Sequence, residues 1–328
     1  MRLGIAALGI ISALPLGAQT LVISNMNNTT AQLIDVTRGA VVATLPTTSV
    51  PHEVAVSPNG KWAVVTDYGA QQPGSTVTLI DVATAKVAKT ISFAPYQRPH
   101  GAVFLNDNRT LVLTAERDSL LVLVDVEAGK IISTRKTGQR VGHMVAIPRD
   151  QKTAFVANIT AGTLSIVDLA GSAEPVVIKV GSQTEGIGVT PDGRSVWMGS
   201  NNTGKVYIVD VGRKEVVDSL RTSGTPYRIA FTPDGTSAIV TNPEQDEIRL
   251  FDVASHSERA KVKITREDGK PVGPQGIVIS PDGSRAWITM GTANYVAEYS
   301  LPAMRSLRQW DVAAGPDGIA YSSQQARP

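Results

Sequence analysis

The stretch TPDGTSAIVTNPEQDEIRLFDV, residues 232–253, decides the fold of this chain. It opens on the turn Thr232-Pro233-Asp234-Gly235, where proline presets φ, aspartate caps the turn and glycine takes the positive φ. An apolar strand ending in Ile239-Val240-Thr241-Asn242 follows, and after a loop a second strand ends in Leu250-Phe251-Asp252-Val253. This order of turn, strand, loop and strand predicts antiparallel β structure.

The same unit recurs along the whole chain. The strand that ends in aspartate recurs at intervals of 46, 44, 43, 42 and 42 residues, with Asp35, Asp81, Asp125, Asp168, Asp210 and Asp252. A seventh copy, Glu298-Tyr299-Ser300-Leu301, has serine in place of aspartate. The proline-glycine turn recurs at 57–60, 190–193, 232–235 and 280–283, with looser turn chemistry at 106–108 and 149–151. Four antiparallel strands per repeat of this length are the unit of a propeller blade.

The two ends of the chain complement each other. Leu21-Val22-Ile23-Ser24-Asn25 has the pattern of a second strand with no first strand before it. Gly318-Ile319-Ala320-Tyr321 has the pattern of a first strand with nothing after it. Joined, they complete a seventh blade and remove the exposed edges of an open ring. The sequence therefore predicts an all-β fold: one domain, residues 19–328, forming a seven-bladed β-propeller closed by its terminal strands.

These motifs resemble a known family. The strands 21–25, Phe155-Val156-Ala157-Asn158 and Ile239-Val240-Thr241-Asn242, with the strands and turns around them, are similar to the YVTN repeat of bacterial and archaeal β-propellers. The resemblance covers essentially all of residues 19–328 and implies the propeller architecture. That family holds surface-layer proteins and export-pathway binding proteins, so the resemblance implies no single function. More distantly, the chain resembles the haem-binding propeller of cytochrome nitrite reductase and the lactonase propellers.

Composition and the first residues narrow the class of protein. With 42% hydrophobic residues, 18% charged residues and a net charge of +2, the chain is typical neither of a disordered protein nor of a nucleic-acid-binding one. Met1-Arg2, the apolar run 3–16 and Gly17-Ala18 are typical of a signal peptide, residues 1–18, cleaved before Gln19. No second apolar stretch and no cysteine follow, so we expect a periplasmic or secreted protein without a membrane span, lipid-anchored thiol or disulfide.

Seven equivalent positions lie just before the inner strands, on the face where propeller loops usually bind ligands. Aligning the repeats gives His52, His100, His143, Glu185, Tyr227, Gln275 and Asp317. Three of the four histidines fall here in consecutive blades, and with Glu185 they form a ligand set that suits zinc, copper, iron or a haem-type group. Two alternatives stay open: these side chains satisfy backbone groups at the strand entry, or they contact a polar organic ligand.

Longer loops on the same face supply a second ring. Its members are Asn25, Asp67, Tyr68, Glu116, Arg117, Asp118, Asn158, Asn201, Asn202, Asn242 and Asn294, and Arg98, Arg140 and Arg228 flank the inner ring. Guanidinium groups bind carboxylate or phosphate through paired hydrogen bonds, so an arginine-rich mouth suits an anion. The alternative is that these arginines pair with Glu116, Glu185 or Asp317. We expect the asparagines at strand ends to stabilise turns.

Other repeated residues indicate structure. The six aspartates of the third strands sit at hairpin turns, where a short carboxylate accepts backbone N–H groups, so we interpret them as turn caps and not as catalytic acids. Trp62, Trp197 and Trp287 share one position in second strands, which predicts packing between blades. His256 falls in a turn on the opposite side of the repeat. No nucleophile elbow, P-loop or dinucleotide fingerprint occurs in the sequence.

Two classes of function fit these observations. The first is a non-enzymatic binding or scaffold protein whose channel-mouth face docks an envelope protein, a peptide, a polysaccharide or a small anion. The second is an enzyme or electron-transfer accessory that holds a metal or haem-type group with His52, His100 and His143, or a lactonase-like hydrolase that uses the same cluster. The lack of a catalytic motif favours the first class.

Overall fold

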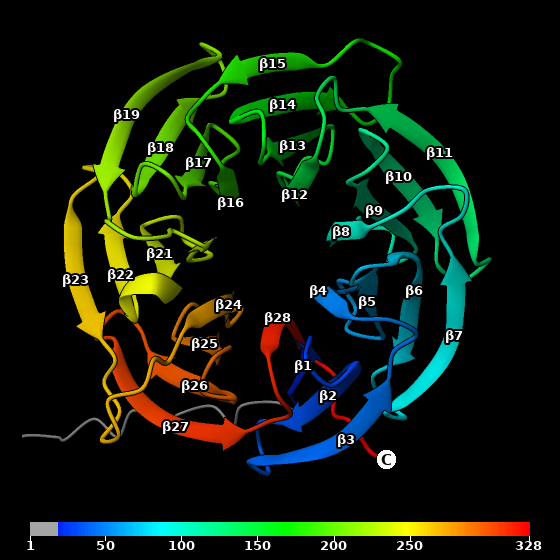
Figure 1. Ribbon diagram of the computed structural model, residues 1–328, viewed down its shortest axis with the longest axis vertical. Coiled ribbons are helices and arrows are strands. Elements are labelled where there is room, and N and C mark those ends of the chain that lie inside the picture. The colour runs from blue at the N-terminus through cyan, green and yellow to red at the C-terminus, as the bar shows by residue number, and fades with distance from the viewer. Residues whose placement is uncertain (1–18) are drawn as a thin grey trace, which may run out of the picture.

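Seven four-stranded antiparallel sheets stand around a central axis in the computed structural model, which describes residues 19–328 (Figure 1). In six of the sheets the strands pair in chain order from the innermost to the outermost, and in the seventh the last strand of the chain takes the innermost place. The predicted seven-bladed β-propeller is therefore confirmed. The predicted signal peptide, residues 1–18, lies outside the described residues.

Blades 1 to 3 follow one another along the chain. Blade 1 contains β4 (Pro51–Val56), β5 (Trp62–Gly69), β6 (Pro73–Asp81) and β7 (Lys86–Ser92). Blade 2 contains β8 (Pro99–Phe104), β9 (Thr110–Ala115), β10 (Leu120–Asp125) and β11 (Lys130–Lys136). Blade 3 contains β12 (Gly142–Ala146), β13 (Thr153–Asn158), β14 (Thr163–Asp168) and β15 (Val176–Lys179).

Blades 4 to 6 repeat this order. Blade 4 contains β16 (Thr184–Val189), β17 (Ser195–Ser200), β18 (Lys205–Asp210) and β19 (Glu215–Arg221). Blade 5 contains β20 (Arg228–Phe231), β21 (Ser237–Asn242), β22 (Glu247–Asp252) and β23 (Glu258–Lys263), with a 3-10 turn, η1 (Pro243–Gln245), between β21 and β22. Blade 6 contains β24 (Pro274–Ile279), β25 (Arg285–Met290), β26 (Tyr295–Ser300) and β27 (Arg305–Asp311).

Blade 7 closes the ring with strands from both ends of the described chain. Its order is β28 (Pro316–Ser322), β1 (Thr20–Asn25), β2 (Thr30–Asp35) and β3 (Ala40–Pro46). Strands β1 and β28 are antiparallel, with Val22 opposite Ala320. Beyond β28, Ala326 is fully buried and its backbone N–H donates to the Thr20 hydroxyl at 2.9 Å. The predicted pairing of the terminal strands is confirmed, and the last residues of the chain reinforce it.

Burial follows the position of a strand within its blade. All six residues of β21 are buried, whereas the outer strand β23 alternates between exposed and half-buried residues. Trp197 and Trp287 are 0% exposed in β17 and β25, and Trp197 meets Phe231 of the next blade edge to face at 5.4 Å. These two tryptophans pack one blade on the next, as predicted. Trp62 does not share their position: it is the first residue of β5, opposite Asp81, whereas Trp197 and Trp287 are the third residues of their strands, and Trp62 is half-buried.

The repeated turns hold themselves with local hydrogen bonds. Asp234 accepts the Thr232 hydroxyl at 2.5 Å and the Thr236 backbone N–H at 3.0 Å, and Gly235 has φ +73°. At the other hairpin, Asp252 accepts the backbone N–H of Ser255 at 2.7 Å. The aspartates of the repeat are turn caps in the structure.

Among residues 19–328 there is no helix with the length and apolarity that a membrane crossing requires.

The closure of blade 7 gives a first prediction. Deleting residues 315–328 removes β28 and the buried Ala326, so β1 loses its inner partner and becomes an edge. We expect the melting temperature to fall by roughly 10 °C or more, or the chain not to fold. Thermal denaturation followed by circular dichroism measures this.

A disulfide between β1 and β28 should raise the melting temperature, whereas the deletion lowers it. The chain has no cysteine, so a Val22→Cys, Ala320→Cys pair across β1 and β28 forms the only possible disulfide. Its oxidised form should melt above its reduced form. A truncated chain that melts like the full-length protein would show that closure does not stabilise the ring.

Candidate functional site

The seven predicted ring residues lie at the entries of the seven inner strands. Six of them are within the first three residues of an inner strand, and Tyr227 directly precedes β20. The backbones of four of them are fixed by hydroxyl groups of the preceding blade. Ser24, Thr114, Thr241 and Thr289 donate to the ring carbonyls of the following blade, at 2.7 Å for Thr114 to His143 and 2.8 Å for Thr289 to Asp317. The alignment of the seven repeats therefore identified structurally equivalent residues.

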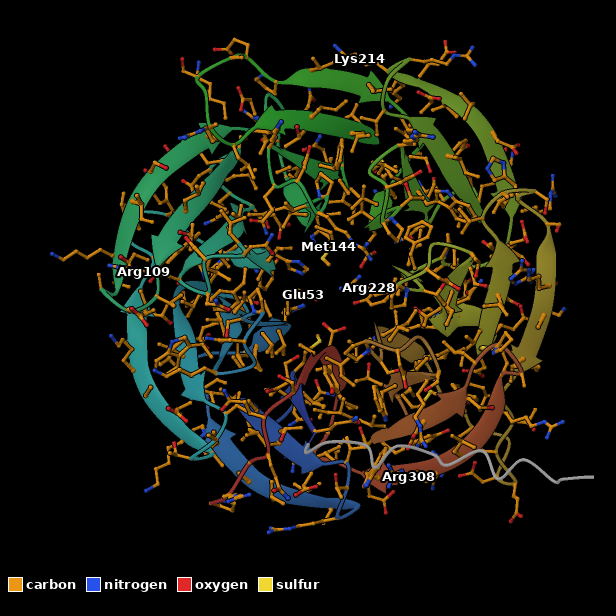
Figure 2. The ribbon with its side chains drawn as sticks, turned by 180° about the vertical axis from the view of Figure 1, so that it is seen from behind. Glu53, Arg109, Met144, Lys214, Arg228 and Arg308 are labelled. Atoms are coloured by element: carbon orange, nitrogen blue, oxygen red, sulfur yellow. The ribbon has the colours of Figure 1, made fainter. Side chains whose placement is uncertain are left out.

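Glycine follows the ring residue in four blades. A side chain there would collide with the backbone of the next blade. A Cβ at Gly276 would lie 2.1 Å from the Asp317 carbonyl oxygen, and one at Gly318 would lie 2.5 Å from that of His52. Gly101 and Gly186 are equally crowded by the backbone of the next blade. The other three blades carry Glu53, Met144 and Arg228 at this position, and these side chains extend into the centre of the ring (Figure 2).

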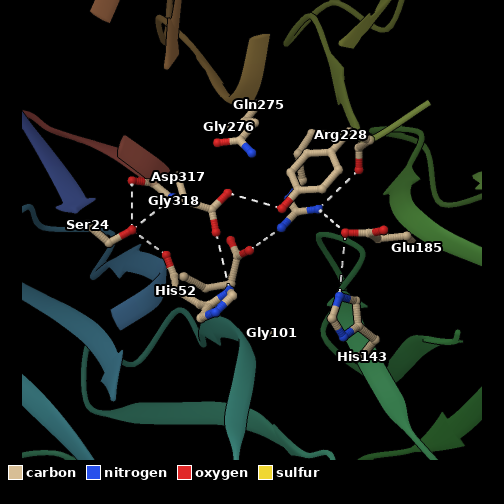
Figure 3. Close-up of polar contacts among 12 residues, drawn as sticks. Ser24, His52, Gly101, His143, Glu185, Arg228, Gln275, Gly276, Asp317 and Gly318 are labelled. Atoms are coloured by element: carbon tan, nitrogen blue, oxygen red, sulfur yellow. Dashed lines mark hydrogen bonds and ion pairs between the residues drawn. The ribbon is translucent and has the colours of Figure 1, made fainter. Parts of the chain in front are cut away.

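A buried ion pair spans the channel. Arg228 Nη2 donates to Glu53 Oε1, which joins blade 5 to blade 1, and Arg228 Nη1 lies 3.5 Å from Glu185 Oε1 (Figure 3). The side chains of Arg228 and Glu53 are only 8% and 10% exposed. Removing one member of such a buried pair leaves an uncompensated charge, which costs about 3–5 kcal/mol. Arg228 thus pairs with Glu185, one of the partners expected for it, and also with Glu53.

A second pair joins blades 1 and 7. His52 Nδ1 lies 3.3 Å from Asp317 Oδ2, and the Tyr227 hydroxyl donates to Asp317 Oδ1 at 3.2 Å. Asp317 is fully buried. Burial alone would raise the pKa of Asp317, but its contact with His52 and the nearby charge of Arg228 hold that pKa below its ordinary value. Asp317 is thus a charged group held between a histidine and a tyrosine.

His143 lies between two carboxylates. Its Nδ1 is 3.6 Å from Glu116 Oε2, and its Nε2 is 3.6 Å from Glu185 Oε1. Burial favours the neutral ring, but the contacts with Glu116 and Glu185 outweigh it and raise the pKa of His143 to about 9. His143 is therefore an imidazolium at neutral pH.

His100 stacks on that imidazolium and is itself neutral. The ring centroids of His100 and His143 are 3.8 Å apart, and His100 is 1% exposed. Burial, together with the charges of His143 and His52, lowers the pKa of His100 well below its ordinary value. Its Nδ1 has no hydrogen-bond partner among the described residues. On its other side His100 meets His52 and Tyr68, each at 5.1 Å between ring centroids.

The histidine cluster does not fit the expected metal centre. His52, His100 and His143 are neighbours, as predicted, but His143 is enclosed by Glu116 and Glu185 and stacked on His100. Over residues 19–328 no group of three or more histidine, aspartate or glutamate side chains is arranged to hold a metal ion. The geometry therefore gives no support to the predicted metal or haem-type group.

Several of the remaining predicted residues line two openings on the mouth face. Arg98 and Arg140 line a cavity of about 640 Å³, together with Tyr68, Glu116, Arg117, Ser119 and Val141. Gln275 lines a smaller cavity of about 370 Å³ between blades 6 and 7, with Asn27, Thr292 and Asn294. Arg98 and Arg140 do not form the carboxylate pairs that were the alternative for them.

The asparagines of the second ring are structural at the strand ends. Asn158 and Asn242 are 0% exposed. Asn158 Nδ2 donates to the Ser165 hydroxyl at 2.8 Å, and Asn242 Oδ1 accepts the Thr225 backbone N–H at 3.0 Å. These bonds stabilise the loops of the mouth, as expected.

Glu53 is the site residue that the sequence analysis missed. It follows His52 in an inner strand, at the position that is glycine in four other blades. The signal was present: two of the three exceptions at this position, Glu53 and Arg228, carry opposite charges. A ring brings all seven copies of one position around one axis, so opposite charges at that position predict a pair across the channel.

The charge of His143 gives a second prediction. Its pKa rises from the ordinary 6.5 to about 9 in the folded protein, so its stabilising contribution is complete below pH 6.5 and is lost as pH rises through about 9. We expect the free energy of unfolding to fall by about 3 kcal/mol over this interval. Urea denaturation between pH 6 and 10 measures the loss.

A substitution should remove that pH dependence. His143→Gln cannot take up the proton, so its stability should be nearly flat over the same interval. The control is His256→Gln, since His256 contacts Asp218 and lies far from the mouth in the repeat. Equal slopes for His143→Gln and the wild type would contradict the assignment of the charge to His143.

Solved structures share the fold. A functionally unknown protein from Desulfotomaculum acetoxidans DSM 771 superposes with a TM-score of 0.74 at 12% identity, covering 92% of this chain and 98% of that one. Hydrazine synthase of Kuenenia stuttgartiensis superposes with a TM-score of 0.70 at 17% identity, covering 82% of this chain and 88% of that one. No curated protein matches the sequence. The YNCE-like β-propeller family model matches residues 103–268, half of the chain, which agrees with the repeats, and the protein belongs to this family.

Proposed function

We propose that this protein is a non-enzymatic binding protein that holds its ligand at the channel-mouth face. The observation that carries the proposal is the open cavity of about 640 Å³ at that face, which has the size of a small-molecule site and is lined by loops of a rigid ring. Two residues of its lining contact the ring: Glu116 lies 3.6 Å from His143, and Tyr68 packs on His52 and His100.

The side chains that pair across the ring favour capture over passage. Arg228 of blade 5 and Glu53 of blade 1 meet across the ring axis, and Asp317 of blade 7 contacts Tyr227 and His52, the residues that precede them in the chain. Arg228, Asp317 and His52 are labelled in Figure 3. These paired groups lie at the axis, outside the lining of the cavity, and their mutual contacts do not require a bound ligand.

The same pairing argues for binding over catalysis. A general acid or base needs a nitrogen or oxygen that can reach a substrate proton. Both ring nitrogens of His143 face carboxylates, and Asp317 is buried between His52 and Tyr227. These groups stabilise one another's charges, which suits a preorganised surface.

A ligand screen tests the proposal. The purified protein is heated with a panel of anionic, cationic and neutral metabolites and short peptides, and a bound ligand raises the melting temperature by mass action. Hydrogen–deuterium exchange then locates each ligand that binds. We expect protection of the mouth loops around residues 97–99, 116–119 and 139–142.

The opposite face provides the internal control for this experiment. Protection confined to the turns at 190–193 and 232–235, which lie at the other end of the blades, would place binding on the wrong face. A panel that leaves the melting temperature unchanged throughout would equally contradict the proposal.

We also propose that the protein is exported. The pattern of residues 1–18 supports this, and cleavage before Gln19 would leave all strands of the ring intact, because β1 begins at Thr20. Expressed from its full-length sequence, the protein should therefore appear outside the cytoplasm with Gln19 as its first residue. Mass spectrometry of the intact protein measures this, and an uncleaved amino terminus in the cytoplasmic fraction would contradict export.

A further inference from the structure

We propose that the cavity at the mouth binds an oxyanion, a carboxylate or phosphate group, between Arg98, Arg117 and Arg140. The inference rests on the proposed binding function and names the chemical class of the ligand. The three arginines come from the loops that enter and cross blades 2 and 3, so three separate segments direct their side chains to one opening.

The lining carries more positive than negative charge. Three arginines face one carboxylate, Glu116, and Glu116 lies against His143. The nearby Asp118 accepts the Gln97 backbone N–H at 2.9 Å and does not line the cavity. The cavity therefore presents an excess of unneutralised positive charge, which attracts an anion.

The guanidinium groups keep most of their hydrogen-bond donors free. In the described part of the chain none of the three forms a salt bridge with a carboxylate: Arg98 donates to the Ala70 carbonyl at 2.8 Å, and Arg117 donates to Gln97 Oε1 at 3.3 Å. Arg140 forms no side-chain hydrogen bond there and is exposed. Each guanidinium has five N–H donors, so paired donors remain for an oxyanion.

Arg98 is held ready for such a contact. Its guanidinium lies over the ring of Tyr68 at 4.5 Å, and stacking of this kind orients the planar group without using its donors. Burial and the neighbouring Glu116 raise the pKa of Tyr68 to about 12, so this tyrosine stays neutral. The least exposed of the three arginines is therefore also the one whose orientation is fixed.

The backbone under these residues is strained. Arg98, Ser119 and Val141 line the cavity with φ of +53°, +59° and +56°, a region that side chains rarely adopt and that is least suited to β-branched valine. At the position two residues before the ring residue, blade 4 has Gln183 at φ +54°, and blades 6 and 7 use Gly273 and Gly315. Strain of this kind persists where the surroundings enforce it and gathers at binding sites.

A cavity of similar size on the opposite face lacks this excess of charge. It measures about 660 Å³ and is lined by Arg149, Arg194 and Arg259 together with Asp192, Asp234 and Asp252. Arg259 pairs with Asp252, and Arg149 donates to the Pro233 carbonyl at 2.9 Å. The number of arginines is equal, but the charge is balanced, so this cavity provides a matched control.

Calorimetry with defined anions tests the inference. Citrate and succinate represent carboxylates, phosphate and pyrophosphate represent phosphates, and succinamide is the neutral counterpart of succinate. We expect at least one anion series to bind and succinamide not to bind. The carboxylate and phosphate arms separate the two sources of oxyanion, and the stronger series identifies the ligand class.

Paired substitutions locate the site. Arg117→Gln with Arg140→Gln should weaken anion binding by about a hundredfold, roughly tenfold for each guanidinium removed. Both side chains are exposed, so the fold should tolerate the change. Arg149→Gln with Arg194→Gln removes the same charge on the opposite face and should leave binding unchanged. Arg140→Lys, which keeps the charge without the fork, should recover part of the affinity.

The outcomes separate this inference from the proposed function. Equal losses in the two double variants, or no binding by any of the four anions, would overturn the oxyanion site. If neutral or cationic ligands protect the mouth loops while the four anions do not bind, the oxyanion site falls and the proposed function stands. If protection appears only on the opposite face, both fall.

Discussion

The close approach of neighbouring blades at their inner strands is the constraint on which the rest of the structure depends. Where the backbone of one blade comes within about 2–3 Å of the Cβ position of the next, as at Gly276 and Gly318, only glycine fits. At the same level, hydroxyl groups such as Thr114 and Thr289 donate to the carbonyls of the following ring residues. Sterics and hydrogen bonding thus fix the ring positions to one another at five of the seven blade junctions.

This constraint also explains the composition of the repeat. The threonine of Ile239-Val240-Thr241-Asn242 donates across the blade junction to Gln275, and the asparagine stabilises the loop that follows. Apolar residues before them are buried because each second strand lies between two other blades. A motif that looks like a family signature is therefore a set of separate physical requirements of the ring.

The features that depend on the repeat spacing could be predicted from the sequence. Contacts between side chains on opposite sides of the ring could not. Blade number, closure and the ring positions followed from spacing, because every copy has the same local surroundings. The pairing of Glu53 with Arg228 joins residues 175 positions apart, and the length of the side chains decides it. The same holds for Glu116, whose contact with His143 leaves Arg98 and Arg140 without the carboxylate that the sequence offered them.

The charged side chains are not distributed evenly among the seven blades, and this affects where a ligand can bind. The structural charges concentrate at the axis and neutralise one another, whereas the unpaired arginines lie off the axis, over blades 2 and 3. A ligand there is held by two neighbouring blades and not by the whole ring, so its affinity depends on a few preorganised side chains. The backbones of Arg98 and Val141 are held by local hydrogen bonds: Arg98 N–H donates to the Gly74 carbonyl, and the Ile159 N–H donates to the Val141 carbonyl. In this propeller the repeated blades form the rigid ring, and the residues that differ between blades, such as Arg98, Arg117 and Arg140, give the mouth its charge.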